Sequence, residues 1–194
     1  MATKHLTYVF SIRSPYAWLA TRGVVPRVGS DVEIDWVPFL PLPGFENFET
    51  PIVPAKATHN LQDILRFAKF FELRVGRPPV DEPEWKPAHT AFLRAKDLGR
   101  GAEFAIEMTR MRWEEGLRVS GLDAIGVAAE RVGLEPEEVR EAAVDPEQQT
   151  ALCDLVRQNY DEAGIFGVPM FVLPSGERFW GQDRLLWALE QGYI

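Results

Sequence analysis

Hydrophobic and polar residues change their spacing along the chain, and these changes predict where strands and helices lie. Residues 7–12 form a strand-like apolar run, and residues 31–37 alternate with the two-residue period of a half-buried strand. Residues 15–28, between these runs, have the spacing of a helix. Near the C-terminus, a loop from residue 164 leads through a Val-Pro step into a strand, and Phe179-Trp180 precedes a last helix. Strands are therefore expected at both ends of the chain.

The middle of the chain has a helical pattern. A proline-rich stretch at 38–54 is predicted to be an irregular loop, and the segments after it have the apolar spacing of helices. The predicted helices cover residues 55–75, 88–98, 102–115, 122–132, 135–143 and 145–163. This order favours one thioredoxin-like α/β unit over 1–194, with a helical block at about 55–144 inserted between sheet-forming parts at about 1–54 and 145–194.

Composition narrows the class of partner. The 194 residues are 46% hydrophobic, enough for a sizeable core, and carry a net charge of -8 with acidic and basic residues interspersed. We expect no nucleic-acid partner, because such a partner needs a clustered basic surface. No apolar run reaches membrane-spanning length and no apolar leader precedes the first strand, so we expect no membrane partner and a cytoplasmic location.

Cysteine and histidine limit the redox and metal chemistry. Cys153 is the single cysteine, which excludes an internal disulfide and a four-cysteine zinc site, and we expect it to be a buried, inert thiol. No two of His5, His59 and His89 have the spacing of metal ligands on one helix face, so we predict no metal site. Neither a Gly-x-Ser-x-Gly elbow nor a glycine-rich phosphate loop is present.

Some residues at the predicted element ends are candidates for a site, and each also has an ordinary structural role. Ser14 and Pro15 have the pattern of a helix N-cap followed by a first-turn proline. Asp183 begins the last helix, where a cap or first-turn charge competes with contact to a ligand. Pro169 would turn the backbone of Val168 towards an extended ligand if their bond were cis, although most X-Pro bonds are trans.

Further candidates lie in and after the proline-rich loop. Lys56 and His59 are near the start of the helix predicted at 55–75 and could face a pocket, although solvated roles account for both. Phe39, Phe45 and Phe48 could line an apolar cavity or serve the core.

Together these segments resemble one family, the 2-hydroxychromene-2-carboxylate isomerases and the related kappa-class glutathione transferases, within the DsbA-like thioredoxin group. The segments that carry the resemblance are Ser14-Pro15-Tyr16-Ala17-Trp18-Leu19-Ala20, Pro54-Ala55-Lys56 with Asp63, Arg66 and Ala68, Gly164-Ile165-Phe166-Gly167-Val168-Pro169, and Phe179-Trp180-Gly181-Gln182-Asp183-Arg184-Leu185. They cover nearly the whole chain in the family's order. The resemblance implies a DsbA-like fold, and Trp113-Glu114-Glu115-Gly116 is similar to part of the family's helical insert.

The resemblance also implies an activity, that of a glutathione-dependent isomerase. Ser14 stands where a thioredoxin dithiol has its first cysteine, and it is expected to face the thiol of bound glutathione. The glutathione thiolate would add to the substrate, allow its ring to open and a bond to rotate, and leave again. A dithiol oxidoreductase is disfavoured, because positions 14 and 17 are serine and alanine.

Binding roles follow from the same resemblance. Val168, beside a cis Pro169, would hold the cysteinyl backbone of glutathione, and Gln182 with Asp183 would hold its γ-glutamyl end. Lys56 would line the site for the anionic part of a small aromatic or electrophilic substrate. Members of the family are commonly dimers, so a homodimer is a possible assembly.

Three positions depart from the family pattern and leave alternatives open. His59 replaces a common aromatic residue in the substrate site, Ser11 replaces a common acidic residue, and Arg13 replaces a small or apolar one. The alternatives to the isomerase are a kappa-like glutathione transferase acting on electrophiles and a non-catalytic thioredoxin-like ligand-binding module. The thiol itself could be glutathione or another low-molecular-weight thiol.

Overall fold

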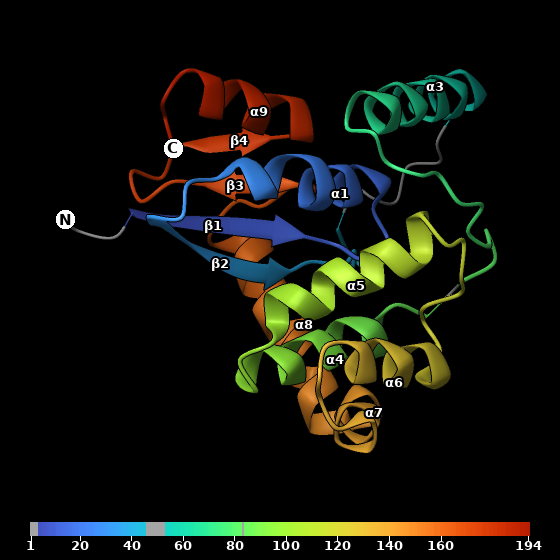
Figure 1. Ribbon diagram of the computed structural model, residues 1–194. Helices are drawn as coiled ribbons and strands as arrows, with labels where there is room; N and C mark the ends of the chain where they lie inside the picture. The colour runs from blue at the N-terminus through green and yellow to red at the C-terminus, as the bar shows by residue number, and fades with distance from the viewer. Residues whose placement is uncertain (1–3, 46–52, 83) are drawn as a thin grey trace.

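One mixed sheet, built from both ends of the chain, forms the centre of the protein. The computed structural model describes residues 4–45, 53–82 and 84–194. Within this part the strand order is β2-β1-β3-β4 (Figure 1). β1 (Lys4–Phe10) pairs parallel with β2 (Val32–Pro38) and antiparallel with β3 (Met170–Val172), which pairs antiparallel with β4 (Arg178–Trp180). The predicted thioredoxin-like β-α-β and β-β-α arrangement is confirmed.

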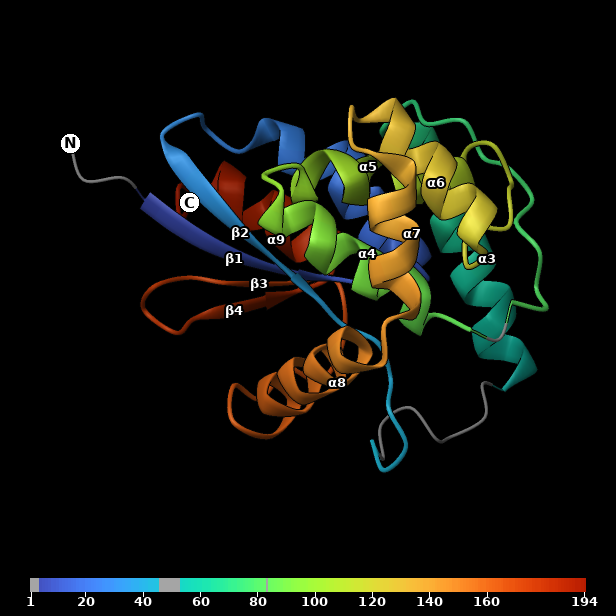
Figure 2. The same ribbon diagram turned by 90° about the horizontal axis from the view of Figure 1, so that it is seen from below.

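Helices cover both faces of this sheet. Their bounds are α1 (Pro15–Leu19), continued by a π-helical turn (Ala20–Val24) and a 3-10 turn (Val25–Arg27), α3 (Pro54–Phe70), α4 (Lys86–Asp97), α5 (Gly101–Trp113), α6 (Leu122–Arg131), α7 (Pro136–Val144), α8 (Pro146–Asp161) and α9 (Gln182–Glu190). α1 and α9 contact each other on one face, whereas α4 and α8 contact each other on the opposite face (Figure 1, Figure 2). α3 packs against α1 and stands apart from α4 to α7 (Figure 1).

Aromatic side chains of the central strand form the middle of the core. The fully buried ring of Tyr8 stacks on Phe171 of β3 with 4.4 Å between centroids, and meets the edge of Trp36 of β2 at 4.9 Å. The Tyr8 hydroxyl donates to the Ala17 carbonyl at 2.9 Å and lies 2.8 Å from the Thr21 hydroxyl, which satisfies a polar group that burial would otherwise penalise. The same residue therefore joins the sheet to the helical run after Ser14.

Strand register brings two distant loops together. Val9 of β1 lies opposite Met170 of β3, and these two strands are antiparallel. The residues that follow β1 must therefore lie beside those that precede β3. This places the turn at 11–14 next to the loop at 167–169.

The helix predicted over 55–75 ends earlier than its pattern suggests. α3 stops at Phe70, and Glu72 has a φ of 58°, a left-handed conformation that is unusual for a residue other than glycine. Only part of its predicted apolar face is covered, since Ala68 is buried whereas Leu61 and Leu65 are exposed. The reason is that α3 contacts the rest of the protein mainly through α1.

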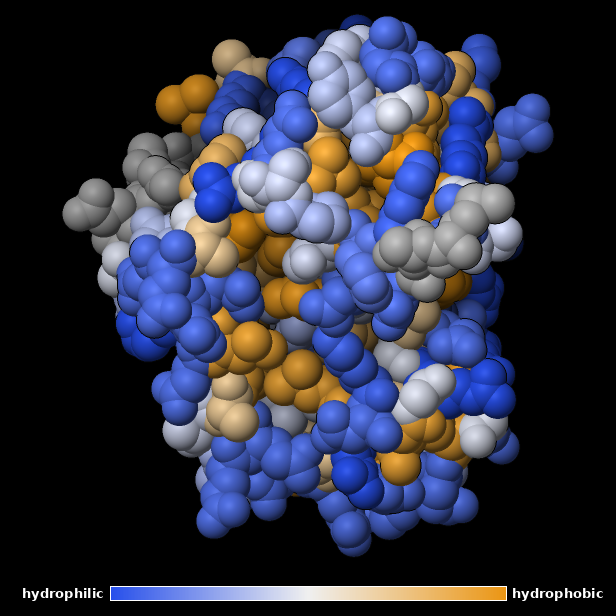
Figure 3. Space-filling model, turned by 90° about the vertical axis from the view of Figure 1, so that its left-hand side faces the viewer, coloured by the Kyte–Doolittle hydropathy of each residue, from blue (hydrophilic) through white to orange (hydrophobic). Residues whose placement is uncertain are grey.

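The surface is mostly polar where it is seen in Figure 3, with separate apolar areas between charged side chains. Among the described residues, no helix combines the length and the apolar character that crossing a membrane requires. Cys153, expected to be buried, is partly exposed on α8. That expectation was wrong because the residue lies at the flank of the face that α8 buries through Leu152 and Val156.

Candidate active site

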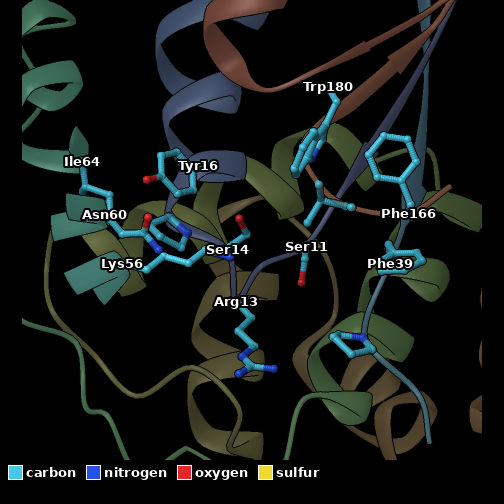
Figure 4. A pocket seen from close by; sticks show the side chains of 14 residues that line it. Ser11, Arg13, Ser14, Tyr16, Phe39, Lys56, Asn60, Ile64, Phe166 and Trp180 are labelled. Carbon is cyan, nitrogen blue, oxygen red and sulfur yellow. The ribbon is translucent and has the colours of Figure 1, made fainter. Parts of the chain in front are cut away.

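A cavity of about 660 Å³ opens where β1 ends and α1 begins. Figure 4 shows Lys56, Asn60 and Ile64 reaching into it from α3 on one side, and Phe166 and Trp180 facing them from the other. Its lining residues are Ser11, Arg13, Ser14, Pro15, Tyr16, Phe39, Pro41, Lys56, Asn60, Ile64, Phe166, Gly167, Val168 and Trp180. The two parts of the sheet-forming unit and the first helix of the inserted block therefore all contribute to one cavity.

Ser14 lines this cavity and is the N-cap of α1. Its backbone is extended (φ -84°, ψ 123°), and its Oγ accepts a hydrogen bond from the Ala17 N–H at 3.2 Å. Pro15 occupies the first helical position, where its missing N–H costs nothing. The capping bond uses an oxygen lone pair of Ser14, so the hydroxyl proton remains available for a group in the cavity.

The Val168-Pro169 peptide bond is cis, as predicted. Val168 lines the larger cavity together with Ser14, and the Pro169 carbonyl accepts a hydrogen bond from the Gly181 N–H at 2.9 Å. Within the described part of the chain, the N–H and C=O of Val168 make no hydrogen bond. A peptide-like ligand could pair with both groups as one strand pairs with another.

A second cavity, of about 280 Å³, adjoins the first along Tyr16, Lys56, Asn60, Val168 and Trp180. Its other lining residues are Asp63, Pro169, Gly181, Gln182, Asp183 and Arg184. Two carboxylates, one from α3 and one from α9, thus share a small space. Partial burial, with the charges of these two carboxylates, raises the pKa of Tyr16, so its phenol stays protonated and can donate a hydrogen bond.

Gln182 and Asp183 both line this smaller cavity at the start of α9. Gln182 is buried, with 3% of its surface exposed, and its side-chain amide has no hydrogen-bond partner among the described residues. The helix cap is Gly181, with a φ of 107°, so Asp183 is a first-turn residue and the alternative of an Asp183 cap was wrong. The Asp183 carboxylate pairs with Arg184 at 2.9 Å, an exposed ion pair of small energetic value.

Two cations line the larger cavity. Lys56 and Arg13 have no ion-pair partner among the residues that the structure describes, in a chain whose net charge is -8. His59 is exposed and lines neither cavity, so the structure does not bring it to the site, contrary to expectation. The reason is helical geometry, because one step along α3 turns a side chain by about 100° relative to Asn60, which does line both cavities.

Aromatic side chains form the remaining wall. Phe39 lines the cavity, whereas Phe45 stacks on Tyr160 in the core, and Phe48 lies outside the described residues. Phe166 and Trp180 meet edge to face at 5.1 Å. Both residues belong to segments that carry the family resemblance. Their place in the cavity wall depends on the turn before β3, and the spacing of hydrophobic residues does not predict the path of that turn.

Comparison with known proteins identifies the fold family. Residues 5–190 match the model of the DSBA-like thioredoxin domain. The chain belongs to this family. This DsbA-like chain is 26% identical over 174 residues to the uncharacterized protein YwbO of Bacillus subtilis (strain 168), covering 88% of this chain and 87% of YwbO.

Solved structures agree with this DsbA-like fold. The similar structures include a 2-hydroxychromene-2-carboxylate isomerase (TM-score 0.84, 18% identity, 97% of this chain and 94% of that one). A probable DsbA oxidoreductase from Streptomyces coelicolor has a TM-score of 0.75 at 20% identity, over 98% and 90% of the chains. The cytosolic disulfide reductase DsbM from Pseudomonas aeruginosa, solved with GSH, has a TM-score of 0.69 at 16% identity, over 98% and 100%. At these identities the likeness shows the fold alone.

This DsbA-like protein lacks the cysteines of a dithiol site. Ser14 and Ala17 stand at the two ends of the Ser-Pro-Tyr-Ala segment, and Cys153 is the single cysteine of the 194 residues. Disulfide exchange through a pair of cysteines needs two thiols in reach of each other. Such exchange within these 194 residues is therefore excluded. The chemistry of the cavity must instead be inferred from the side chains that line it.

Proposed function

We propose that this protein binds a tripeptide thiol such as glutathione and uses it in the isomerisation of an aromatic substrate. The observation that carries the proposal is the junction of the two cavities beside Ser14 and Val168. A thiol ligand extending from the smaller cavity would meet a second molecule in the larger one. Transfer of glutathione to an electrophile, as in the kappa-class transferases, is the alternative use of the same arrangement.

The residues present fit glutathione. Among the described residues, no hydrogen bond uses the N–H and C=O of Val168 or the side-chain amide of Gln182, so these groups are available to a peptide-like ligand. The γ-glutamyl end carries an ammonium group, which suits the carboxylates of Asp63 and Asp183. The free carboxylate of the same γ-glutamyl end suits Lys56, which lines both cavities. The two charged groups of the γ-glutamyl end would therefore each have a complementary side chain.

Ser14 has the role of favouring the thiolate. Its oxygen accepts from the Ala17 N–H, so its proton can be donated towards a sulfur atom. A hydrogen bond to the anionic form lowers the pKa of a thiol, and the start of a helical run adds a favourable electrostatic effect. Glutathione, when bound, supplies a thiolate that can add to an electrophilic carbon and leave again. Ser14 itself remains protonated throughout.

The larger cavity suits an aromatic substrate that carries a negative charge. Phe166 and Trp180 supply exposed apolar surface, with the buried Phe39 also in the wall, and cavities of a few hundred cubic ångströms are typical of small-molecule sites. Lys56 and Arg13 supply positive charge on the same lining. Arg13 departs from the family pattern, and its positive charge could bind the negative charge of an isomerase substrate.

Calorimetric titration with glutathione tests the binding half of the proposal. We expect binding by the wild type and a loss of roughly tenfold or more in Asp183→Ala, because a charge-assisted hydrogen bond is worth about 1.5–3 kcal/mol. Glu190→Ala, at the exposed far end of the same helix, is the control for the change in net charge. Equal affinities of Asp183→Ala and Glu190→Ala would leave Asp183 without a role in binding.

Two enzyme assays test the chemical half. 2-hydroxychromene-2-carboxylate reports isomerisation and 1-chloro-2,4-dinitrobenzene reports transfer, each measured with and without glutathione. Turnover of the first alone supports the isomerase, and turnover of the second alone supports the transferase. Glutathione binding without turnover of either would refute the catalytic proposal and favour a ligand-binding module.

A further inference from the structure

A fully buried histidine lies directly behind the turn that carries Ser14. His89, in α4 of the helical block, has no exposed surface and lines neither cavity. Its Nδ1 is 2.8 Å from the Trp85 carbonyl oxygen, and its Nε2 is 3.2 Å from the Ile12 backbone nitrogen and 3.2 Å from the Ser11 Oγ. The ring therefore spans from the helical block to the segment between β1 and α1.

The partners of this ring determine where its proton is. A carbonyl oxygen can only accept, so Nδ1 must carry the proton that is donated to Trp85. A backbone N–H can only donate, so Nε2 must present its lone pair to Ile12. Both requirements select the same neutral tautomer. The Ser11 hydroxyl, facing the same lone pair, must then donate to the ring as well.

The turn held by this ring is also held from its other side. The Ile12 carbonyl accepts a hydrogen bond from the Trp113 indole at 3.3 Å, and the Ser14 N–H donates to the Ser11 carbonyl at 3.0 Å. The N–H and the C=O of Ile12 are therefore bound by side chains from α4 and α5 respectively. Ser14 follows two residues later, so its place relative to the cavity depends on this clamp.

We propose that His89 is a positioning residue, whose neutral ring holds the turn at 11–14 and thereby fixes the Ser14 hydroxyl towards the cavity. The part of this inference that concerns the bound thiol rests on the proposed function. Protonation of the ring would replace the lone pair at Nε2 with a second N–H and break the bond to Ile12. Burial lowers the pKa of His89 to about 4, which agrees with a permanently neutral acceptor at neutral pH.

Amide hydrogen exchange tests the clamp without any ligand. In His89→Leu, which has no acceptor, the Ile12 and Ser14 amides should exchange at least about tenfold faster, whereas amides of α7 and α8 should not change. His89→Gln should restore much of the protection, because its amide oxygen can accept from Ile12. Thr90→Val is the matched control, since Thr90 is buried on the same helix and, among the described residues, its hydroxyl bonds only to the Lys86 carbonyl.

Nitrogen NMR of the wild-type ring provides a second test that needs no variant. The Nε2 signal should be of the unprotonated type and the Nδ1 signal of the protonated type at neutral pH. A protonated Nε2 would overturn the proposal, even if His89→Leu failed to fold. Equal exchange of Ile12 and Ser14 in His89→Leu and Thr90→Val would overturn it as well.

Glutathione as the probe connects the clamp to Ser14. The ultraviolet absorbance of the bound thiolate, followed against pH, should show a higher thiol pKa in His89→Leu than in His89→Gln or Thr90→Val. Faster exchange with an unchanged thiol titration would make His89 a structural residue only and would overturn the positioning role. If the wild type binds no glutathione, the proposed function fails while exchange and ring NMR still decide whether the clamp exists.

Discussion

Ser14→Ala separates two contributions of one hydroxyl, capping and chemistry. As a cap, Ser14 accepts one bond of 3.2 Å from the Ala17 N–H, and loss of a serine cap typically costs ~1 kcal/mol. For a chain of 194 residues this lowers the melting temperature by only about 2–4 °C. As a thiolate partner it should matter more, because a hydrogen bond to a charged group is worth about 1.5–3 kcal/mol and each pKa unit about 1.4 kcal/mol. We expect the bound thiol's pKa to rise by about one to two units.

Asp145→Ala is the matched control for this experiment. Asp145 caps α8, its Oδ1 accepts from the Gln148 N–H at 2.9 Å, and it lines neither cavity. Both variants should lose similar stability in thermal unfolding, whereas only Ser14→Ala should shift the thiolate absorbance of bound glutathione and slow turnover. If both variants keep the wild-type thiol titration, Ser14 is a helix cap alone and the catalytic reasoning is refuted.

Three further variants test the fold and the cavity wall. Burial lowers the pKa of His89 from 6.5 to about 4, so between these pH values the unfolded state binds more protons than the folded state. Acidification from pH 7 to pH 4 should therefore lower the free energy of unfolding of the wild type by up to ~3 kcal/mol more than that of His89→Gln, as measured by urea unfolding. Equal pH profiles of the two proteins would contradict this prediction. Glu72→Gly should raise the free energy of unfolding by about 0.5–1 kcal/mol, since glycine adopts the φ of 58° without strain, and a loss of stability would show that the side chain matters more. Gly167→Ala puts a Cβ 2.8 Å from the Trp180 indole nitrogen, so it should change indole fluorescence and weaken glutathione binding, whereas Gly121→Ala, which meets no atom within 4 Å, should do neither.

The fold follows closely from sequence periodicity and helix signals. The two-residue and helical periods predicted the strands at both ends and the helices between them, and the helix predicted at 145–163 agrees closely with α8, which Asp145 caps. The exceptions have tertiary causes. The helix after Ser14 turns into a π-helical turn where a Cβ on Gly23 would lie 2.3 Å from the Phe71 ring, a contact between segments almost fifty residues apart. Periodicity within one segment carries no signal of such a contact.

The candidate site was predictable where a residue lies at the end of an element. Ser14 and Gln182 are at such ends and Val168 lies just before β3, and each of them lines at least one of the two cavities, although their roles in binding and catalysis stay predictions. His59 was expected at the site because it lies near the start of the helix predicted at 55–75. The orientation of α3 turns its side chain away from both cavities. His89 was considered only as a metal ligand. Its contact with Ser11 spans 78 residues and depends on the packing of the helical block against the sheet.

The hydrogen bonds to Ile12 show how the helices between β2 and β3 help to hold the candidate site in place. An isolated thioredoxin-like unit would leave the Ile12 N–H and C=O to water at the point where the site begins, and a solvated turn samples more conformations than one that buried partners hold. Here α4 supplies an imidazole and α5 an indole to the N–H and the C=O of that single residue. Glu114, directly after α5, accepts hydrogen bonds from Trp18 at 3.1 Å and Arg22 at 2.7 Å, which anchors the helical run that follows Ser14. Because the segments before and after Ser14 are both tied to the same block, displacement of that block relative to the sheet would move the serine. The geometry of Ser14 is therefore set by the helical block as much as by the strand and helix that it joins.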